Sequence, residues 1–297
     1  MVADDPRVRV EFRGLDGIKL VADRWEPEEP GDSLGTVLLL HGGGQTRHSW
    51  ARTAQVLASR GWTAIAVDAR GHGDSDRSPD GSYTLDHFAG DVHGIARDCD
   101  HPPVLIGASL GGRASLALAG DHPDSISGLV LVDIAARTEE SGRSEVREFM
   151  ASAPNGYASL EEVAEAINAY NPSRRRPRNL EGLKKNLRLH ADGRWYWHWD
   201  PAFLRYAETD LDETTARLNT AARKVTAPTL VVRGNKSNLV TPEAVAELLE
   251  LVPTARAVEV TAGHMIAGDD NDIFATHLFE FLTTDVLDGQ AARSRNS

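Results

Sequence analysis

Gly107-Ala108-Ser109-Leu110-Gly111-Gly112 is the stretch that decides the fold of this 297-residue chain. It follows the apolar run Val104-Leu105-Ile106 and precedes Arg113–Ala119, a run of small residues typical of a helix. The pattern G-x-S-x-G between a strand and a helix predicts a tight turn with the serine at its apex, because larger side chains two positions away on either side would collide with both elements. The turn exposes the Ser109 hydroxyl at a sheet edge and a helix N-terminus. Ser109 is therefore our candidate nucleophile.

A serine nucleophile needs a base, an acid that orients the base, and N–H donors for the oxyanion. The candidate base is His264, which follows the strand-like run Arg256–Val260 on a loop that can reach the serine; the alternative interpretation is an ordinary loop histidine, one of 11 in the chain. The expected donors are the backbone N–H groups of Leu110, directly after the serine, and of Gly43, in the glycine-rich loop after the apolar run 36–40.

Four motifs of this chain occur in the order seen in the α/β-hydrolase superfamily. They are His41-Gly42-Gly43, the turn Asp68–Ser75, the serine turn and Gly263-His264. Over roughly residues 8–285, except the middle, the chain resembles the capped branch of that superfamily, which includes serine esterases, lactone hydrolases and C–C bond hydrolases. The resemblance implies an α/β fold: a mostly parallel twisted sheet with helices on both faces and an inserted helical cap.

The acid is where the chain departs from the superfamily pattern. In most members an acidic residue stands in the turn after the strand that follows the cap, but here Ser237 holds that position and Asn238 follows it. Some members place the acid one strand earlier, and Leu131-Val132-Asp133-Ile134-Ala135 is similar to their motif. We therefore expect Asp133 to orient His264. The alternatives are that Asp133 only caps the entry to the cap, or that Asp269 or Asp270 is the acid.

Strand-like and helix-like runs alternate along most of the chain, which indicates a mostly parallel sheet covered on both faces. The alternation stops near residue 135 and resumes near 228, so we expect a core of residues 1–134 and 226–285, a cap of residues 135–225 and a flexible tail of residues 286–297. The expected core strands and helices are 8–13, 19–25, 37–40, 50–60, 63–68, 86–99, 104–108, 110–121, 129–133, 228–233, 242–252, 256–260 and 272–284. The expected cap helices are 145–151, 160–170, 180–190 and 211–224.

Aromatic residues of the cap are the candidates for a substrate pocket. Trp195 and Trp197 belong to the densest aromatic cluster in the chain, and Trp50 follows the glycine-rich loop. These rings could line an apolar pocket, or they could join the cap to the core. The basic run 174–178 could attract an acidic substrate, although such runs more often form a solvated face.

Composition narrows the classes of partner and compartment. The net charge of −12 argues against nucleic acid and anionic membranes as partners. No apolar run approaches the ~20 residues that cross a bilayer, the first residues do not form a secretory signal, and the single cysteine, Cys99, fits a reducing compartment. We expect a cytoplasmic monomer or homodimer that acts on a small molecule. No cluster with metal-ligand spacing is present, so we expect neither metal nor cofactor.

These features predict a serine hydrolase that cleaves a carboxylic ester or lactone of a small, largely apolar substrate through an acyl-enzyme. The serine at the turn disfavours the epoxide hydrolases and haloalkane dehalogenases, which resemble this chain but attack with an aspartate. Three alternatives stay open: a cofactor-free dioxygenase, a C–C bond hydrolase using the same triad, and a ligand-binding member without turnover.

Overall fold

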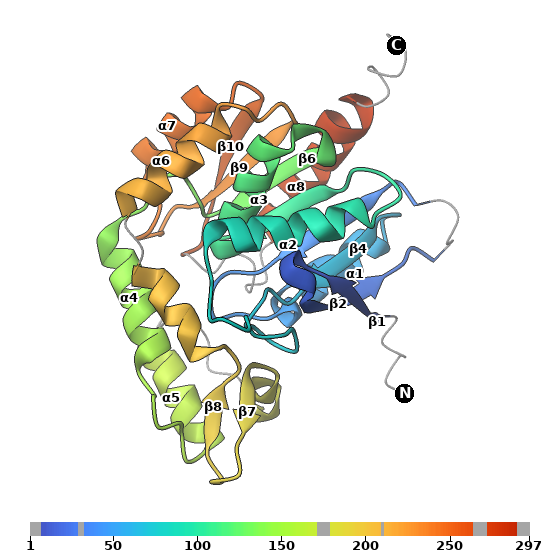
Figure 1. Ribbon diagram of the computed structural model, residues 1–297. Coiled ribbons are helices and arrows are strands. Elements are labelled where there is room, and N and C mark those ends of the chain that lie inside the picture. Colours follow the sequence, from blue (N-terminus) through green and yellow to red (C-terminus); the bar gives the residue numbers. More distant parts are fainter. Residues whose placement is uncertain (1–6, 29–32, 171–178, 209–210, 264–271, 290–297) are drawn as a thin grey trace.

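A computed structural model describes residues 7–28, 33–170, 179–208, 211–263 and 272–289 (Figure 1). Its centre is an eight-stranded sheet in the order β1-β2-β4-β3-β5-β6-β9-β10. Strand β2 is antiparallel to β1 and β4, and all other neighbours are parallel. The strands are β1 Val8–Arg13, β2 Lys19–Trp25, β3 Thr36–Leu40, β4 Thr63–Val67, β5 Val104–Ala108, β6 Gly128–Val132, β9 Thr229–Gly234 and β10 Ala255–Val260. The predicted mostly parallel sheet is confirmed, with strand limits within one or two residues.

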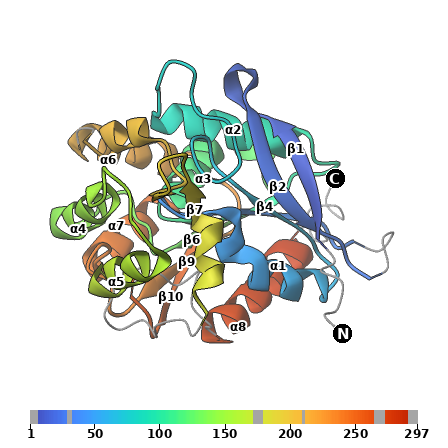
Figure 2. The same ribbon diagram turned by 90° about the horizontal axis from the view of Figure 1, so that it is seen from below.

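The central strands are apolar on both faces because each face carries its own layer of helices. Side chains alternate along each strand: Leu38 and Leu40 face one buried cluster, whereas Val37 and Leu39 face the other. Figure 2 shows α1 and α8 on one side of the sheet and α2 and α3 on the other. The helices of the two layers are α2 Leu85–Arg97, α3 Leu110–Asp121, α6 Leu211–Ala222 and α7 Pro242–Leu251 in the first, and α1 Ala51–Ala58 and α8 Asp272–Phe281 in the second.

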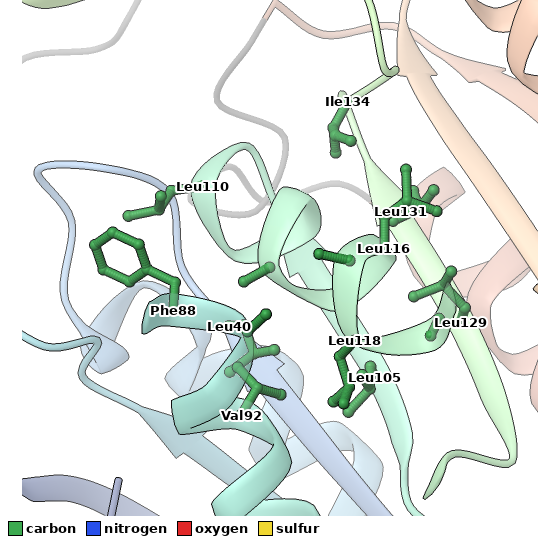
Figure 3. Close-up of a cluster of buried hydrophobic side chains, with 14 of the residues drawn as sticks. Leu40, Phe88, Val92, Leu105, Leu110, Leu116, Leu118, Leu129, Leu131 and Ile134 are labelled. Atoms are coloured by element: carbon green, nitrogen blue, oxygen red, sulfur yellow. The ribbon is translucent and has the colours of Figure 1, made fainter. Parts of the chain in front are cut away.

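Helix α3 is packed on all sides at the centre of the first layer. Figure 3 shows Leu116 and Leu118 of this helix close to Leu129 and Leu131 of β6, with Leu110 close to Phe88 of α2. This packing fixes the N-terminus of α3, where the serine turn lies, relative to the ends of β5 and β6.

The end of the chain departs from the prediction. After α8 a π-helix covers Leu282–Leu287. Val286, which we had assigned to the flexible tail, is fully buried, and one of its methyl groups closely approaches Gly128 of β6. Val286 and Leu287 therefore belong to the core, because their apolar side chains pack in the second layer. The rest of the predicted tail, 290–297, lies outside the described residues.

The segment between β6 and β9 contains helices and a small hairpin; Figure 1 shows α4, α5 and the hairpin at one end of the molecule and α6 beside α7. Its elements are α4 Glu140–Ala151, α5 Leu160–Tyr170, a 3₁₀ helix Leu180–Asn186, β7 Leu187–Leu189, β8 Trp195–Trp197, a 3₁₀ helix Pro201–Glu208, and α6. The predicted helix 180–190 is a 3₁₀ helix up to Asn186 and is wrong from residue 187 on. Its last residues pair with the aromatic run of β8, because aromatic side chains favour strands and Gly193, at φ 76°, reverses the chain.

The predicted cap boundaries at residues 135 and 225 stay a prediction. Helix α6 lies inside them but packs against α3: a Cβ atom at Gly120 would lie 2.3 Å from the Ala221 carbonyl oxygen. Helix α4 also packs into the first core cluster, through Met150. Helix α5 and the hairpin, in contrast, have a small buried cluster of their own around Tyr157, Val163 and Leu187. The inserted segment is thus attached to the core at one end and has independent packing at the other.

Candidate active site

The predicted serine turn forms between β5 and α3. Ser109 has φ 47° and ψ −110°, a conformation that L-residues seldom adopt. The glycines on either side are required by close approach. A Cβ atom at Gly107 would lie 2.5 Å from the Gly111 carbonyl carbon, and one at Gly111 would lie 2.4 Å from the Leu40 carbonyl oxygen. The surrounding backbone therefore leaves no room for the turn to relax.

Asp133 stands at the carboxyl end of the neighbouring strand β6, with its side chain buried and its backbone at φ 49°. Its Oδ1 accepts the Gly234 N–H at 3.0 Å, and its Oδ2 accepts the Ser237 hydroxyl at 2.6 Å. Ser237 is the residue at the position where the superfamily pattern expects an acid. The turn after β9 thus supplies donors to a carboxylate that comes from β6.

His264 lies outside the described residues, and so do Asp269 and Asp270. The chain is described up to Gly263, directly before the histidine. The Ala262 carbonyl accepts the Lys236 N–H at 3.0 Å, and a Cβ atom at Gly234 would lie 2.6 Å from the Gly263 carbonyl oxygen. The peptide that precedes His264 therefore lies beside Gly234, whose N–H binds Asp133.

The glycine-rich loop after β3 approaches the serine from another side. A Cβ atom at Gly42 would lie 3.3 Å from the Ser109 Cβ. Neighbouring N–H groups are in use: Gly42 donates to Gln45 Oε1 at 3.0 Å, and Gly44 donates to His72 Nε2 at 3.1 Å.

The N–H groups of Gly43 and Leu110, which we predicted to bind the oxyanion, differ from these neighbouring N–H groups. The Gly111 N–H donates to the His41 carbonyl at 3.1 Å. Within the part of the chain that the structure describes, the N–H groups of Gly43 and Leu110 have no acceptor. Leu110 opens α3, where N–H groups have no intrahelical partner and attract negative charge.

Three buried histidines, His41, His72 and His198, lie at or beside the glycine-rich loop. Burial lowers the pKa of His41 to about 4 and of His72 to about 3, and it lowers the pKa of His198 well below the ordinary value. Their rings lie near one another, at 5.3 Å between His41 and His72 and 5.7 Å between His72 and His198. All three are therefore neutral at pH 7.

The hydrogen bonds of these histidines assign their tautomers. His72 Nε2 accepts from Gly44, so Nδ1 carries the proton and donates to the Arg70 carbonyl at 3.0 Å. His198 Nδ1 accepts the Gly73 N–H at 2.7 Å, so Nε2 faces the Gly44 carbonyl as the donor at 3.4 Å. His198 comes from the inserted segment, and sequence reasoning did not single it out.

The Asp68–Ser75 turn connects several loops through ion pairs. Arg70 and Asp91 form a buried two-point ion pair with both N–O distances at 2.7 Å. Asp74 pairs with Arg188 of the inserted segment at 2.7 Å and with the buried Arg47 at 3.1 Å. Arg47 also pairs with Asp68, and no sequence motif had marked it.

Of the three tryptophans predicted for the pocket, one lines a cleft and two do not. Trp197 lines a cleft of about 440 Å³ between the glycine-rich loop and the inserted segment. Trp195 is outside that lining; its backbone pairs with Tyr157 and its ring lies 5.8 Å from the Lys184 ammonium. Trp50 is a correction: it is fully buried in the second core layer, 6.3 Å from Phe274, because the 3₁₀ turn before α1 directs it inward.

Trp199, which the sequence did not single out, lines the cleft beside Trp197. The basic run 174–178 lies outside the described residues. Among the residues that are described, no group of three or more His, Cys, Asp or Glu could hold a metal ion. No described helix is long and apolar enough to cross a membrane.

A family profile for the α/β hydrolase fold matches residues 35–270. The chain belongs to the α/β-hydrolase family. It is 30% identical to esterase Rv0045c of Mycobacterium tuberculosis over 297 residues, covering 91% of this chain and 95% of that protein. It is also 30% identical to 2-(acetamidomethylene)succinate hydrolase of Mesorhizobium japonicum over 237 residues, covering 76% and 80% of the two chains.

Solved structures give the same fold. The crystal structure of E-2-(acetamidomethylene)succinate hydrolase matches 93% of this chain and 99% of its own, with a TM-score of 0.78 and 24% identity. Hydrolases among the relatives, one of them matched over nine-tenths of the chain, support a hydrolase here.

Proposed function

We propose that this protein hydrolyses a carboxylic ester or lactone of a small molecule, with Ser109 as nucleophile, His264 as base and Asp133 as the orienting acid. The observation that carries the proposal is the convergence of three backbone ends. The strained Ser109 turn follows β5, the buried Asp133 carboxylate follows β6, and the peptide before His264 follows β10 and lies beside Gly234 at the end of β9, so all three lie at one edge of the sheet. A fold shared by many functions does not carry the proposal; these residues do.

The reaction that this arrangement supports is acyl transfer to a serine. Ser109 Oγ attacks the carbonyl carbon while His264 takes its proton, and the N–H groups of Gly43 and Leu110 bind the oxyanion. The tetrahedral intermediate expels the alcohol, which receives the proton from His264. Water then attacks the acyl-enzyme, again giving a proton to His264, and the free acid leaves as Ser109 regains its hydrogen.

Asp133 supports this reaction by stabilising the imidazolium and fixing its tautomer. Its two described partners, Gly234 and Ser237, orient the carboxylate. The inserted segment fits the role of a cap: Arg188 and His198 bind it to the loops around the serine turn, so it can exclude water and shape the pocket.

The relatives agree with this proposal at the level of chemistry. The mycobacterial relative is an esterase, and that protein matches this chain over almost its full length. A second relative has a name that specifies hydrolysis of an acylated amino-succinate compound, so the same framework also serves substrates other than simple esters. We therefore place the ester or lactone first and treat an activated amide as the variant to screen beside it.

The first test is covalent labelling by a fluorophosphonate, followed by intact-mass measurement. We expect one adduct on the wild-type protein and none on Ser109→Ala. Ser115→Ala is the matched control: Ser115 is buried in the same helix, where its hydroxyl donates to the Gly111 carbonyl at 2.7 Å, so this variant should still be labelled. A folded wild-type protein without an adduct would contradict the proposal and favour a dioxygenase or a ligand-binding protein. Labelled protein would then be screened with p-nitrophenyl esters and lactones.

A further inference from the structure

The cleft between the glycine-rich loop and the inserted segment combines flat aromatic walls with basic side chains. Trp197 and Trp199 are stacked, with ring centroids 4.9 Å apart and planes 12° apart. Phe149 and Tyr170 are stacked in the same way, at 4.3 Å and 17°. All four side chains line the cleft, whose volume of about 440 Å³ falls in the range of small-molecule sites. Such walls favour a flat or apolar group.

The basic side chains that line this cleft are Arg52, His48 and Lys185, and no carboxylate is among the lining residues. This is unexpected in a chain with 44 acidic and 32 basic residues. Lys185 forms no ion pair with any carboxylate that the structure describes. Its charge is close enough to His48 to help lower the pKa of that side chain, as the smallest contribution after burial and Arg47, which also lower it, and Asp68 and Asp23, which raise it.

The preceding residue, Lys184, provides a contrast. Its ammonium pairs with Glu181 at 2.7 Å and lies 5.8 Å from the centre of the Trp195 ring, and it does not line the cleft. Two adjacent lysines on one 3₁₀ helix thus have different environments. Lys184 has a carboxylate within the protein, whereas Lys185 faces a cleft that contains none.

The cleft extends to the glycine-rich loop after β3, which lies beside Ser109. Gly44 and Gln45 line it, and Gln45 Oε1 holds the Gly42 N–H beside Ser109. The opposite wall is joined to this loop by the hydrogen bond from Thr46 Oγ1 to Asn186 Oδ1 at 3.0 Å. A substrate with its carbonyl at Gly43 can therefore extend along the loop into the cleft.

We propose that this cleft binds the carboxylate-bearing end of an anionic ester, with Lys185 as the residue that selects the carboxylate. The inference rests on the proposed function and narrows its substrate class. From the sequence we expected a largely apolar substrate; the cleft accepts the apolar part between its aromatic walls and adds a negative charge at the far end.

Two pairs of substrates test the inference because each pair differs only in the presence of a carboxylate. The first pair, 4-nitrophenyl butyrate and 4-nitrophenyl hemisuccinate, varies the acyl end. The second pair, phenyl acetate and 3-acetoxybenzoate, varies the alcohol end. We expect the wild-type protein to show a lower KM for the anionic member of at least one pair, and that pair identifies the end that enters the cleft.

Lys185→Met and the matched control Lys184→Met assign the preference to the residue. For the anionic ester we expect Lys185→Met to raise KM about two- to fivefold, the size of an exposed charge interaction. Its kinetics with the neutral ester should stay unchanged, and Lys184→Met should behave as wild type with both. Equal kinetics for the two members of both pairs, or equal effects of the two lysine variants, would overturn the inference.

A binding measurement separates this inference from the proposed function. In Ser109→Ala, titration calorimetry would compare 3-phenylpropionate with 3-phenylpropanol, which share their apolar part. We expect tighter binding of the acid, and about fivefold weaker binding of the acid when Lys185→Met is added. This result would support the anion site even if no ester were hydrolysed. Equal binding of acid and alcohol would overturn the site whatever the catalytic activity.

Discussion

At the scale of single residues, Asp133 and Ser237 divide a role that one acidic residue fills in the usual superfamily pattern. The carboxylate comes from the end of β6, and the turn after β9 contributes the hydroxyl that binds it at 2.6 Å. Ser237 Oγ in turn accepts the N–H groups of Leu239 and Val240, both at 3.2 Å. The serine therefore has a defined orientation, and the charge sits one strand closer to Ser109.

We expect Asp133→Asn to fold and to lose about 10⁴-fold in kcat, because an amide cannot stabilise the imidazolium and favours the wrong tautomer. The measurement is kcat on the best ester of the screen, with a thermal melt to establish folding. Ser237→Ala is the control: it removes one donor to the carboxylate but leaves the charge, so kcat should fall far less.

Near-normal turnover in Asp133→Asn would contradict this assignment. Asp269→Asn and Asp270→Asn would then be compared under the same conditions, because these residues lie five and six positions after His264 in the chain. A large loss in either of them would move the role of the acid to that residue.

The residues recognised from sequence are those with a local pattern. Ser109 lies in a five-residue motif, and Asp133 ends an apolar strand, so both could be found without a structure. Arg47 and His198 could not, because their roles depend on partners far away in the chain: Asp68 for the arginine, and Gly73 for the histidine. The prediction that Trp50 lines the pocket failed for the same reason. Trp50 is close to the glycine-rich loop in sequence, but its contacts are in the core.

At the scale of elements, the serine turn depends on α3 lying directly against β3. A Cβ atom at Gly111 would lie 2.4 Å from the Leu40 carbonyl oxygen and 2.7 Å from the Leu40 Cβ. We expect Gly111→Ala to lower the free energy of unfolding by about 1–3 kcal/mol, as overpacking does in well-packed interiors. It should also reduce kcat, because α3 must shift away from β3 and carries the Leu110 N–H with it.

Urea denaturation and ester kinetics would measure both effects. Gly182→Ala is the matched control for stability, because a Cβ atom at Gly182 meets nothing within 4 Å and the residue is exposed. The control should unfold at the wild-type midpoint. A Gly111→Ala protein with unchanged stability and kcat would contradict this prediction, because it would show that the serine turn can accommodate a Cβ atom despite the close contacts with Leu40.

The same scale shows where sequence patterns suffice. The core elements were predictable because buried parallel strands are apolar runs and α2 and α7 begin at threonine N-caps. The inserted segment was harder: residues 180–190 contain leucines at helical spacing, yet residues 187–189 pair with β8. Strand pairing depends on a partner segment, and the sequence suggested two roles for the aromatic run of β8, a pocket wall or a connection of cap to core, but not a strand.

At the scale of the whole molecule, buried polar contacts join the inserted segment to the core. Asp200 accepts the Tyr83 hydroxyl at 2.7 Å, Arg188 pairs with Asp74, and His198 joins Gly73 to Gly44. These contacts cross from one part of the chain to the other where the glycine-rich loop lies. The position of the inserted segment and the shape of the oxyanion loop are therefore coupled through groups that must stay neutral or paired.

This coupling predicts that acid weakens the protein before its carboxylates titrate. In the unfolded chain each histidine takes up a proton near pH 6.5. In the folded state burial lowers the pKa of His41 to about 4 and of His72 to about 3, and it lowers the pKa of His198 well below the ordinary value. The unfolded state therefore binds more protons between the folded and unfolded pKa values. Each of the three histidines should lower the free energy of unfolding by about 1.4 kcal/mol per pH unit below pH ~6.5.

Urea titrations between pH 7.5 and pH 5.0 would measure this slope, and His198→Asn would assign part of it. Asparagine Oδ1 can still accept the Gly73 N–H, which His198 Nδ1 accepts at 2.7 Å, but it takes up no proton. Stability of this variant should fall less steeply below pH 6.5, by one histidine's contribution, while His190→Asn at an exposed position should keep the wild-type slope. His48 and His93, whose pKa values burial also lowers, are present in all three proteins and cancel in the comparison. If His198→Asn and wild type lost stability in parallel, His198 would be able to accept a proton in the folded protein, and the inserted segment would be joined to the catalytic loop by a charge rather than by a neutral ring.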